Sequence, residues 1–272
     1  MSGSYRPEEH AGGLGEELAR LKSQVELSWP EERRLLRALG LTEGMTVVEL
    51  GGGPGFVAEK LLELVPSGAL HVVELNPGMC VLAEARLGAR ARVHRCSVLE
   101  TGLPDARFDL ALARFVFQHL EEPLLAAREA LRLLRPGGRL VVSELDAGLW
   151  GVAEPSLPEL ESIHRKAERL QLQRGGNRFI GRQLVRLLTA AGFTDVRLDV
   201  IAYHSDALGL EAFRRQLDPE RLRPAMDAGL ISQEELEQVR AGYRRFYSTP
   251  SASILMLGFV AHGLRALPVE TL

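Results

Sequence analysis

The segment from Thr46 to Gly55, TVVELGGGPG, constrains the fold more than any other part of the chain. Its apolar residues flank one acid, Glu49, and glycines then follow at every second position, at Gly51, Gly53 and Gly55. A continuous apolar run that ends in glycines predicts a buried parallel strand that enters a tight turn. Because glycine has no side chain, such a turn lets the backbone approach a ligand closely. Residues 56–62 predict a helix, which completes one nucleotide-binding half of a doubly wound sheet.

The spacing of the glycines separates two classes of nucleotide-binding protein. A dinucleotide fingerprint needs G-x-G-x-x-G, but its third glycine, counted from Gly51, would fall on Phe56. The pattern present, acid-x-G-x-G-x-G, resembles motif I of the class I S-adenosylmethionine-dependent methyltransferases. This resemblance implies that Glu49 contacts the methionyl ammonium of that cofactor, directly or through water. The alternative is a glycine-rich strand-to-helix turn in another kind of α/β protein.

A second acid lies where the same resemblance expects one. The strand predicted over residues 71–74 ends on Glu74, about 20 residues beyond the glycine loop, where an acid binds ribose hydroxyls. A carboxylate suits that task because its two oxygens accept from both hydroxyls. An ordinary acid at a strand end is the alternative. The resemblance further implies cofactor contacts from Leu75 or Met79 to the adenine face, from Ser97 and Val98 to the adenine edge, and from Arg114.

The block from FDLALARFVFQHL to LRPGGRLVVSE extends the resemblance, which covers about residues 45–145. Within it we expect a fourth strand over residues 108–113 and a fifth over residues 139–144, with a helix between them that begins after Glu121-Glu122-Pro123. One position departs from the family pattern. Related sequences often have aspartate where this chain has Ser97, so its adenine contact would rest on a hydroxyl.

Composition fits a single large α/β domain. The chain has 272 residues, 46% of them hydrophobic, and a formal net charge of -3. That charge argues against a dedicated nucleic-acid binder. No apolar stretch approaches the roughly 18 residues of a membrane helix, so we expect a cytoplasmic protein without membrane contact. The two cysteines read as small buried residues, and no metal-ligand cluster stands out. The fold class expected is a doubly wound sheet of seven mostly parallel strands with helical cap insertions.

Four regions follow from the pattern. Residues 1–40 predict an N-terminal helical lid, with a second short helix that begins near Pro30. Alternatively, this helical segment only packs on the core. Residues 41–145 form the cofactor-binding half of the core. Residues 146–179 form a helical cap insertion, and residues 180–272 complete the core around a second helical insertion at about 205–249. Capping boxes at Ser156-Glu159 and Ser232-Glu235 mark helix starts in the two insertions.

Histidines near strand ends are the candidates for a general base. His119 follows the fourth strand, where family members commonly present active-site residues, and His204 ends the sixth. Alternatively, His119 only hydrogen-bonds locally and orients its loop. Six further residues are expected to shape the acceptor pocket: Tyr5, Phe115, Trp150, Arg178, Tyr203 and Tyr247.

These observations predict a methyltransferase that moves a methyl group from S-adenosylmethionine to an oxygen, nitrogen or carbon of a small molecule. A bacterial secondary metabolite or a quinone-type compound is the expected acceptor, and a monomer or homodimer the expected form. Two alternatives stay open. A sensor or partner subunit would bind the cofactor without catalysis. An aminopropyltransferase is less consistent, because Pro54 and Arg114 hold places where that class has acids.

Overall fold

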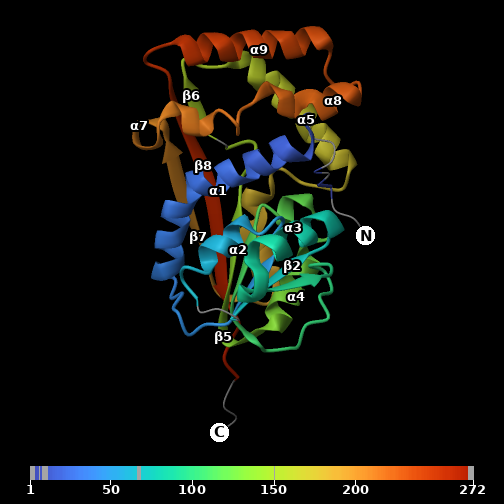
Figure 1. Ribbon diagram of the computed structural model, residues 1–272, viewed down its shortest axis with the longest axis vertical. Coiled ribbons are helices and arrows are strands. Elements are labelled where there is room, and N and C mark those ends of the chain that lie inside the picture. The colour runs from blue at the N-terminus through green and yellow to red at the C-terminus, as the bar shows by residue number, and fades with distance from the viewer. Residues whose placement is uncertain (1–3, 6, 8–11, 66–68, 150, 269–272) are drawn as a thin grey trace.

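Eight strands form one central sheet in the computed structural model (Figure 1). The structure describes residues 4–5, 7, 12–65, 69–149 and 151–268, except for the side chains of residues 160–162 and 164. The hydrogen-bonded order is β3-β2-β1-β4-β5-β8-β6, and β7 pairs with the other edge of β8. β8 runs antiparallel to its three neighbours, and the pairs from β3 to β5 are parallel. The strands are β1 Val47–Leu50, β2 Leu70–Glu74, β3 Arg92–Arg95, β4 Phe108–Arg114, β5 Leu134–Glu144, β6 Gly151–Glu154, β7 Thr194–His204 and β8 Ser253–Leu264.

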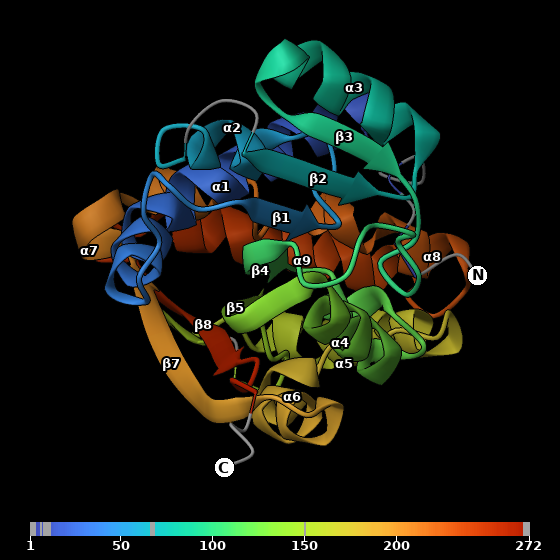
Figure 2. The same cartoon turned by 90° about the horizontal axis from the view of Figure 1, so that it is seen from below.

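Helices cover both faces of this sheet, with α1, α2 and α3 on one side and α4 and α6 on the other (Figure 2). Alternation along the strands explains the two layers: Val47 belongs to one apolar cluster and its neighbour Val48 to the other. The α-helices are α1 Gly13–Ala38, α2 Phe56–Leu61, α3 Pro77–Leu87, α4 Pro123–Leu133, α5 Pro158–Gln173, α6 Leu184–Ala191, α7 Ser205–Leu208, α8 Arg223–Asp227 and α9 Gln233–Ser248. Short 3₁₀ turns are η2 Gly88–Arg90, η3 Phe117–His119, η4 Ile180–Gln183, η5 Leu210–Phe213 and η6 Pro219–Leu222.

The α/β class and the mostly parallel sheet are confirmed, with one strand more than the seven expected. The extra strand, β6, pairs with the first residues of β8 and so continues the line of β5 past its end. Among the described helices, none is both long and apolar enough to cross a membrane. Both insertions gather at one end of the sheet, where α5, α8 and α9 lie together in Figure 1.

The N-terminal helix differs from its prediction. A break near Pro30 was expected, but α1 is one helix of 26 residues with Pro30 inside it and a bend along its length (Figure 1). Proline removes one hydrogen bond and kinks a helix without necessarily ending it. Val25 and Trp29 before the proline and Leu36 after it are all buried, so packing on the core continues across the kink.

The two capping boxes have different outcomes. At Ser232 the box is confirmed: its side chain accepts from the amide of Glu235, whose own side chain accepts from the amide of Ser232. At Ser156 the prediction is wrong, because α5 begins at Pro158 with Leu157 as its N-cap and no side-chain cap. Glu159 instead pairs with Arg245 of α9 and so holds the two insertions together.

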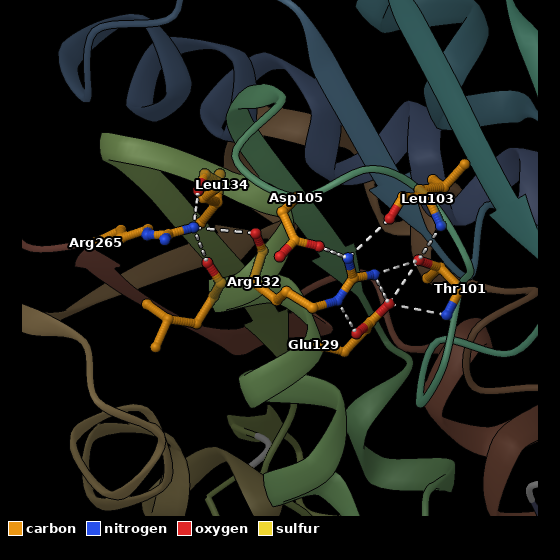
Figure 3. A network of polar contacts seen from close by, with 8 residues as sticks. Thr101, Leu103, Asp105, Glu129, Arg132, Leu134 and Arg265 are labelled. Carbon is orange, nitrogen blue, oxygen red and sulfur yellow. Dashed lines mark hydrogen bonds and ion pairs between the residues drawn. The ribbon is translucent and has the colours of Figure 1, made fainter.

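A charge network fixes the base of the sheet, at the amino ends of the strands (Figure 3). Glu129 of α4 accepts from the amide of Thr101 at 2.8 Å, from its hydroxyl at 2.6 Å, and from Arg132 at 2.6 and 2.8 Å. Arg132 also reaches Asp105 and the carbonyl of Leu103. The loop that connects β3 to β4 is thereby held against the end of α4.

Candidate active site

A cavity of about 790 Å³ opens at the carboxyl ends of β1, β2 and β4. The glycine loop and the ends of β2 and β4 form one half of its wall, and α1 with both insertions forms the other half. Twelve of the predicted site residues line it: Tyr5, Glu49, Gly51, Gly53, Glu74, Leu75, Ser97, Val98, Arg114, Phe115, His119 and Arg178. In an open α/β sheet this edge is where ligands bind.

The glycine loop takes backbone angles that require glycine. Gly51 and Gly53 have φ values of +73° and +54°. A Cβ at Gly51 would lie 2.4 Å from Cγ2 of Val116, and one at Gly52 would lie 2.3 Å from Cγ1 of Val72. Gly53 is different, since nothing lies within 4 Å of its Cβ position. The loop is therefore tightly packed on the protein side and open at Gly53, a residue of the cavity wall.

Glu49 lies on the cavity wall but is almost wholly buried, with 3% of its surface exposed. Its Oε2 has no hydrogen-bond partner among the described residues. Burial raises the pKa of this carboxyl to about 8, against the opposing effect of the Arg114 guanidinium. An orphaned buried acceptor of this kind is stabilised by a donor or a positive charge that enters the cavity.

Glu74 stands across the glycine loop from Glu49. Its two carboxylate oxygens accept from the amides of Gly53 at 2.8 Å and Asn76 at 2.7 Å. Each oxygen keeps a second lone pair for a ligand hydroxyl. Leu75 beside it is 45% exposed and lines the cavity, whereas Met79 is only 2% exposed and does not.

Ser97 and Val98 line the same half of the cavity. The hydroxyl of Ser97 accepts from the amide of Leu99 at 3.2 Å, so a local turn sets its direction. That turn leaves the hydroxyl hydrogen available for one donated bond and a further lone pair for one accepted bond.

Arg114 is engaged by the N-terminal helix. Its Nε lies 3.0 Å from both oxygens of Glu32, and its Nη2 donates to the hydroxyl of Ser28 at 2.7 Å and the carbonyl of Gln24 at 3.3 Å. These contacts tie α1 to the end of β4 at the cavity edge. Phe115 follows with φ +55°, a strained conformation for an aromatic residue, and its ring packs 4.4 Å from the Arg114 guanidinium.

His119 is held from one side. Its Nδ1 lies 2.9 Å from the hydroxyl of Ser4 and 3.4 Å from Nε2 of Gln171, and its ring centroid lies 5.3 Å from that of Tyr5. Burial, with the charges of Arg178 and Arg20, lowers the pKa of the imidazole to about 3. The ring is therefore neutral at physiological pH.

The structure adds wall residues that the sequence reasoning missed. Glu17, Arg20 and Gln24 of α1 line the cavity at helical spacing, and that spacing beside the apolar stripe was a signal available in the sequence. Glu17 accepts from Tyr5 at 2.6 Å and forms two bonds of 2.7 Å with Arg20. Arg221 in η6 also lines the cavity, and no sequence pattern pointed to it.

Five predicted site residues lie outside the cavity wall. His204 is 47% exposed at the end of β7, beside Asp206, and this position does not support a catalytic role. Tyr203 is buried against Gly258 of β8. Tyr247 stacks on Tyr243 within α9, Gly55 packs against α3, and Met79 is enclosed. β7 lies on the far side of β8 from the parallel strands, which separates its end from the cavity. Trp150 lies outside the described residues.

Comparison with known proteins finds a matching domain that lies largely in the first half of the chain. Residues 48–142 match the methyltransferase domain family. An uncharacterised transposon-encoded protein of Streptomyces fradiae is 32% identical over 217 residues, which are 76% of this chain and 61% of that protein. A ubiquinone biosynthesis O-methyltransferase of Bradyrhizobium diazoefficiens is 32% identical over 117 residues, 42% of this chain and 45% of that one. The matches thus span about half of these relatives' own length.

Solved structures share the fold. A candidate sarcosine dimethylglycine methyltransferase of Galdieria sulphuraria superposes with a TM-score of 0.55 and 18% identity, over 97% of this chain and 92% of its own. Phosphoethanolamine N-methyltransferase 2 of Haemonchus contortus, solved with S-adenosyl-L-methionine, gives 0.55 and 19%, over 88% and 53%. Residues 48–142 therefore match a methyltransferase domain, on the fold of structures solved with S-adenosyl-L-methionine, and S-adenosylmethionine is the cofactor of that domain family.

The cavity suits this cofactor on chemical grounds. The orphaned oxygen of Glu49 matches an ammonium, and the accepting oxygens of Glu74 match a ribose diol. Gly53 has open space where any other residue would place a side chain. The cofactor is cationic at its sulfonium and its ammonium, so two carboxylates in this half of the cavity give it a complementary field.

Proposed function

We propose that this protein transfers a methyl group from S-adenosylmethionine to an oxygen, nitrogen or carbon atom of a small molecule held in the other half of the cavity. The observation that carries the proposal is the buried, unpartnered carboxylate oxygen of Glu49, on the same wall as Glu74 and the open backbone of Gly53. This combination provides separate polar partners for the two ends of the cofactor.

Each cofactor contact is assigned to a residue of that wall. Glu49 would hold the methionyl ammonium and Glu74 the ribose hydroxyls. Leu75, with nearly half its surface exposed, would cover the adenine, and Ser97 with the amide of Val98 would contact the adenine edge. Arg114 would act through Glu32 by holding α1 in place, because its guanidinium is already committed to that helix.

The cofactor, when bound, supplies a methyl group on an activated sulfonium. The chain must then align a nucleophile with that carbon and exclude water. The position of α1 supports both tasks, because its side chains line the cavity opposite the glycine loop. We propose that residues 1–40 act as a lid and that the insertions at 146–179 and 205–249 bound the acceptor.

His119 is the proposed contact for the acceptor nucleophile. Its Nδ1 is fixed by Ser4 and Gln171, and its neutral ring can accept a hydrogen bond. With a pKa near 3 it is a poor proton acceptor for an amine or hydroxyl, since general-base catalysis is most efficient at a pKa near the working pH. We therefore propose that His119 orients the nucleophile, and that it acts as a base only where the bound acceptor raises its pKa.

The comparisons and the cavity wall bear on the choice of acceptor and on the two alternative functions. The relative from Bradyrhizobium acts in ubiquinone biosynthesis, which supports a quinone-type acceptor. A bacterial secondary metabolite is the other acceptor that we propose. A binding protein without activity would need the same cofactor wall but no acceptor. An aminopropyltransferase would need an acidic base after β4, where this chain has Arg114 in an ion pair.

Calorimetric titration with S-adenosylmethionine and S-adenosylhomocysteine tests the proposal first. We expect saturable one-site binding of both at micromolar affinity. A labelled methyl donor with a panel of small acceptors then separates an enzyme from a binding protein. In an active reaction, His119→Ala should lower turnover with little change in cofactor affinity. A folded protein that binds neither compound would refute the proposed function.

A further inference from the structure

The acceptor half of the cavity is basic, whereas the cofactor half is acidic. Arg20, Arg174, Arg178 and Arg221 all line the half formed by α1 and the two insertions, where Glu17 is also part of the wall. Glu121 and Glu122, just before α4, line the cavity as well. Glu49 and Glu74 line the other half, beside the glycine loop. A single cavity therefore carries opposite charges at its two ends.

Two of these arginines have an interaction partner within the protein, and two have no carboxylate partner. Arg20 is neutralised by Glu17 through two bonds of 2.7 Å, and Arg174 also has an interaction partner. In the part of the chain that the structure describes, no carboxylate lies within ion-pair distance of Arg178 or Arg221. Arg221 donates through Nη1 to the carbonyl of Gln216, a neutral acceptor.

Arg178 is half-buried, whereas Arg221 is exposed. Burial lowers the pKa of Arg178 against the opposing charge of Glu168, and the charge of Arg20 lowers the pKa of both arginines, opposed at Arg221 by Glu17. Arg178 acts on Arg221 in the same direction. Like charges persist in a partly enclosed site at a cost in free energy unless an anion joins them. The guanidinium group forms paired hydrogen bonds with carboxylates and phosphates, so the missing partner has a defined chemistry.

The cofactor has one anionic group, its methionyl carboxylate, but this group lies beside the ammonium that we assign to Glu49. Its ammonium and sulfonium are positive, and the arginine field would repel them. The carboxylates of Glu49 and Glu74 already complement these positive charges. His119 and Tyr5 line the cavity with the arginines, and the charge of Arg178 lowers the pKa of the His119 imidazole. An anion at Arg178 and Arg221 would thus lie next to the side chain proposed to orient the nucleophile.

We propose that the methyl acceptor is an anion, a small molecule whose carboxylate or phosphate is bound by Arg178 and Arg221 while its nucleophile faces His119. This inference rests on the proposed methyl transfer and adds the charge class of the substrate. Arg178 and Arg221 belong to the two insertions, which line the cavity and lie at one end of the sheet.

The test uses the full chain saturated with S-adenosylhomocysteine and three aromatic probes of similar size. Benzoate and phenyl phosphate carry the two candidate anions, and benzyl alcohol is the neutral control. We expect both anions to bind more tightly than benzyl alcohol. Whichever anion binds more tightly identifies the group that the acceptor carries.

Arginine variants then assign the binding to the proposed residues. Arg178→Met and Arg221→Met should each weaken anion binding by at least about tenfold, as expected for loss of a charged hydrogen-bond partner. Arg186→Met is the matched control, because Arg186 is exposed on α6, outside the cavity wall, and its loss removes the same charge. Affinity for S-adenosylhomocysteine should stay unchanged in all three variants.

The pKa of His119, followed by NMR in the unaltered protein, gives a second readout that does not depend on variant folding. Arg178 and Arg20 lower this pKa and Glu17 opposes them, so a bound anion should raise it from about 3. The inference is overturned if the probes bind equally or if anion affinity survives both substitutions. It is also overturned if the variants lose the cofactor instead, since the arginines would then hold the cofactor's own carboxylate. Failure of the wild-type chain to bind S-adenosylhomocysteine would refute the proposed function separately.

Discussion

Two regions of the molecule are rich in charge, and they use it in opposite ways. At the base of the sheet, Glu129 accepts four hydrogen bonds, and Arg132 bonds to two carboxylates and a carbonyl (Figure 3). Nearby, Nη1 of Arg265 donates to the carbonyls of Leu131, Arg132 and Leu134 at 2.5–3.2 Å and so caps the end of α4. Both oxygens of Glu129 and all three guanidinium nitrogens of Arg132 have a partner there.

At the other end of the strands, some charged groups of the cavity wall lack a hydrogen-bond or ion-pair partner among the described residues. Glu49 has a buried oxygen without a hydrogen bond, and Arg178 and Arg221 have no carboxylate partner in the described residues. An unpaired buried group costs free energy, whereas a satisfied network stabilises the fold. In this pair of regions, the base completes its charge network within the protein, whereas the described residues of the cavity wall leave an oxygen of Glu49 without a hydrogen bond and leave Arg178 and Arg221 without a carboxylate that would balance them.

Removal of Glu129 should have the largest effect on stability. Glu129→Ala leaves the Arg132 guanidinium and the Thr101 amide without their acceptor. We expect the free energy of unfolding to fall by about 2–4 kcal/mol, somewhat less than for a fully buried pair because Arg132 is one-third exposed. Urea denaturation measures the change. Glu84→Ala, at an exposed position on α3, is the control and should shift stability by less than about 0.5 kcal/mol. Equal losses in the two variants would contradict the structural role of the network.

Glu74 should matter for the ligand more than for the fold. In Glu74→Ala the ribose hydroxyls lose a charged acceptor, so cofactor affinity should fall by about 1.5–3 kcal/mol, or roughly 10- to 150-fold. Because Glu74 also accepts from the amides of Gly53 and Asn76, Glu74→Gln is the control that keeps one acceptor oxygen in the loop. Calorimetry measures both variants. Unchanged affinity in Glu74→Ala would remove Glu74 from the ribose site.

Cofactor affinity should depend on pH through Glu49. The empty site holds this carboxyl protonated below its pKa of about 8, and only the ionised form attracts an ammonium. Binding below pH 8 therefore releases a proton, and affinity should rise by close to tenfold, about 1.4 kcal/mol, from pH 6.5 to pH 7.5. Glu49→Gln should bind weakly, with no such slope. A wild-type affinity that is flat over this range would show that Glu49 does not ionise on binding.

Local pattern predicted the cofactor wall well. The apolar strand, the glycine loop and the acid at the end of β2 are short-range features with strict backbone demands, and the cavity contains Glu49, Glu74, Ser97 and Val98 as expected. Their roles in binding stay predictions until they are measured. Position along a motif was sufficient here because parallel strands end at one edge.

Tertiary packing decided what the sequence could not predict. Burial on both sides of Pro30 keeps α1 continuous across a helix breaker. His204 and Tyr203 are adjacent on β7 and so point to opposite faces, and the antiparallel β8 separates both from the cavity. Arg221 reaches the cavity from a 3₁₀ turn inside an insertion that has no periodic pattern, so only the folded chain brings it there.

A pair of identical substitutions compares the two regions most directly, although the expected effects are the smallest. Arg265→Met removes a donor from three carbonyls at the base and should lower the free energy of unfolding by about 1–2 kcal/mol. Arg221→Met removes one bond to the Gln216 carbonyl but also the repulsion from Arg20 and Arg178, so stability should stay within about 0.5 kcal/mol of the parent or rise.

Thermal unfolding without ligand should therefore separate the two variants, by about 2–4 °C for each kcal/mol of difference. Both changes delete one positive charge and keep an unbranched apolar stem, so net charge and side-chain flexibility cancel in the comparison. If Arg221→Met destabilises the empty protein as much as Arg265→Met, Arg221 contributes to the fold through a partner in the free state. Its charge would then not be reserved for a ligand, and the contrast between a saturated base and an unsaturated cavity would fail at that residue.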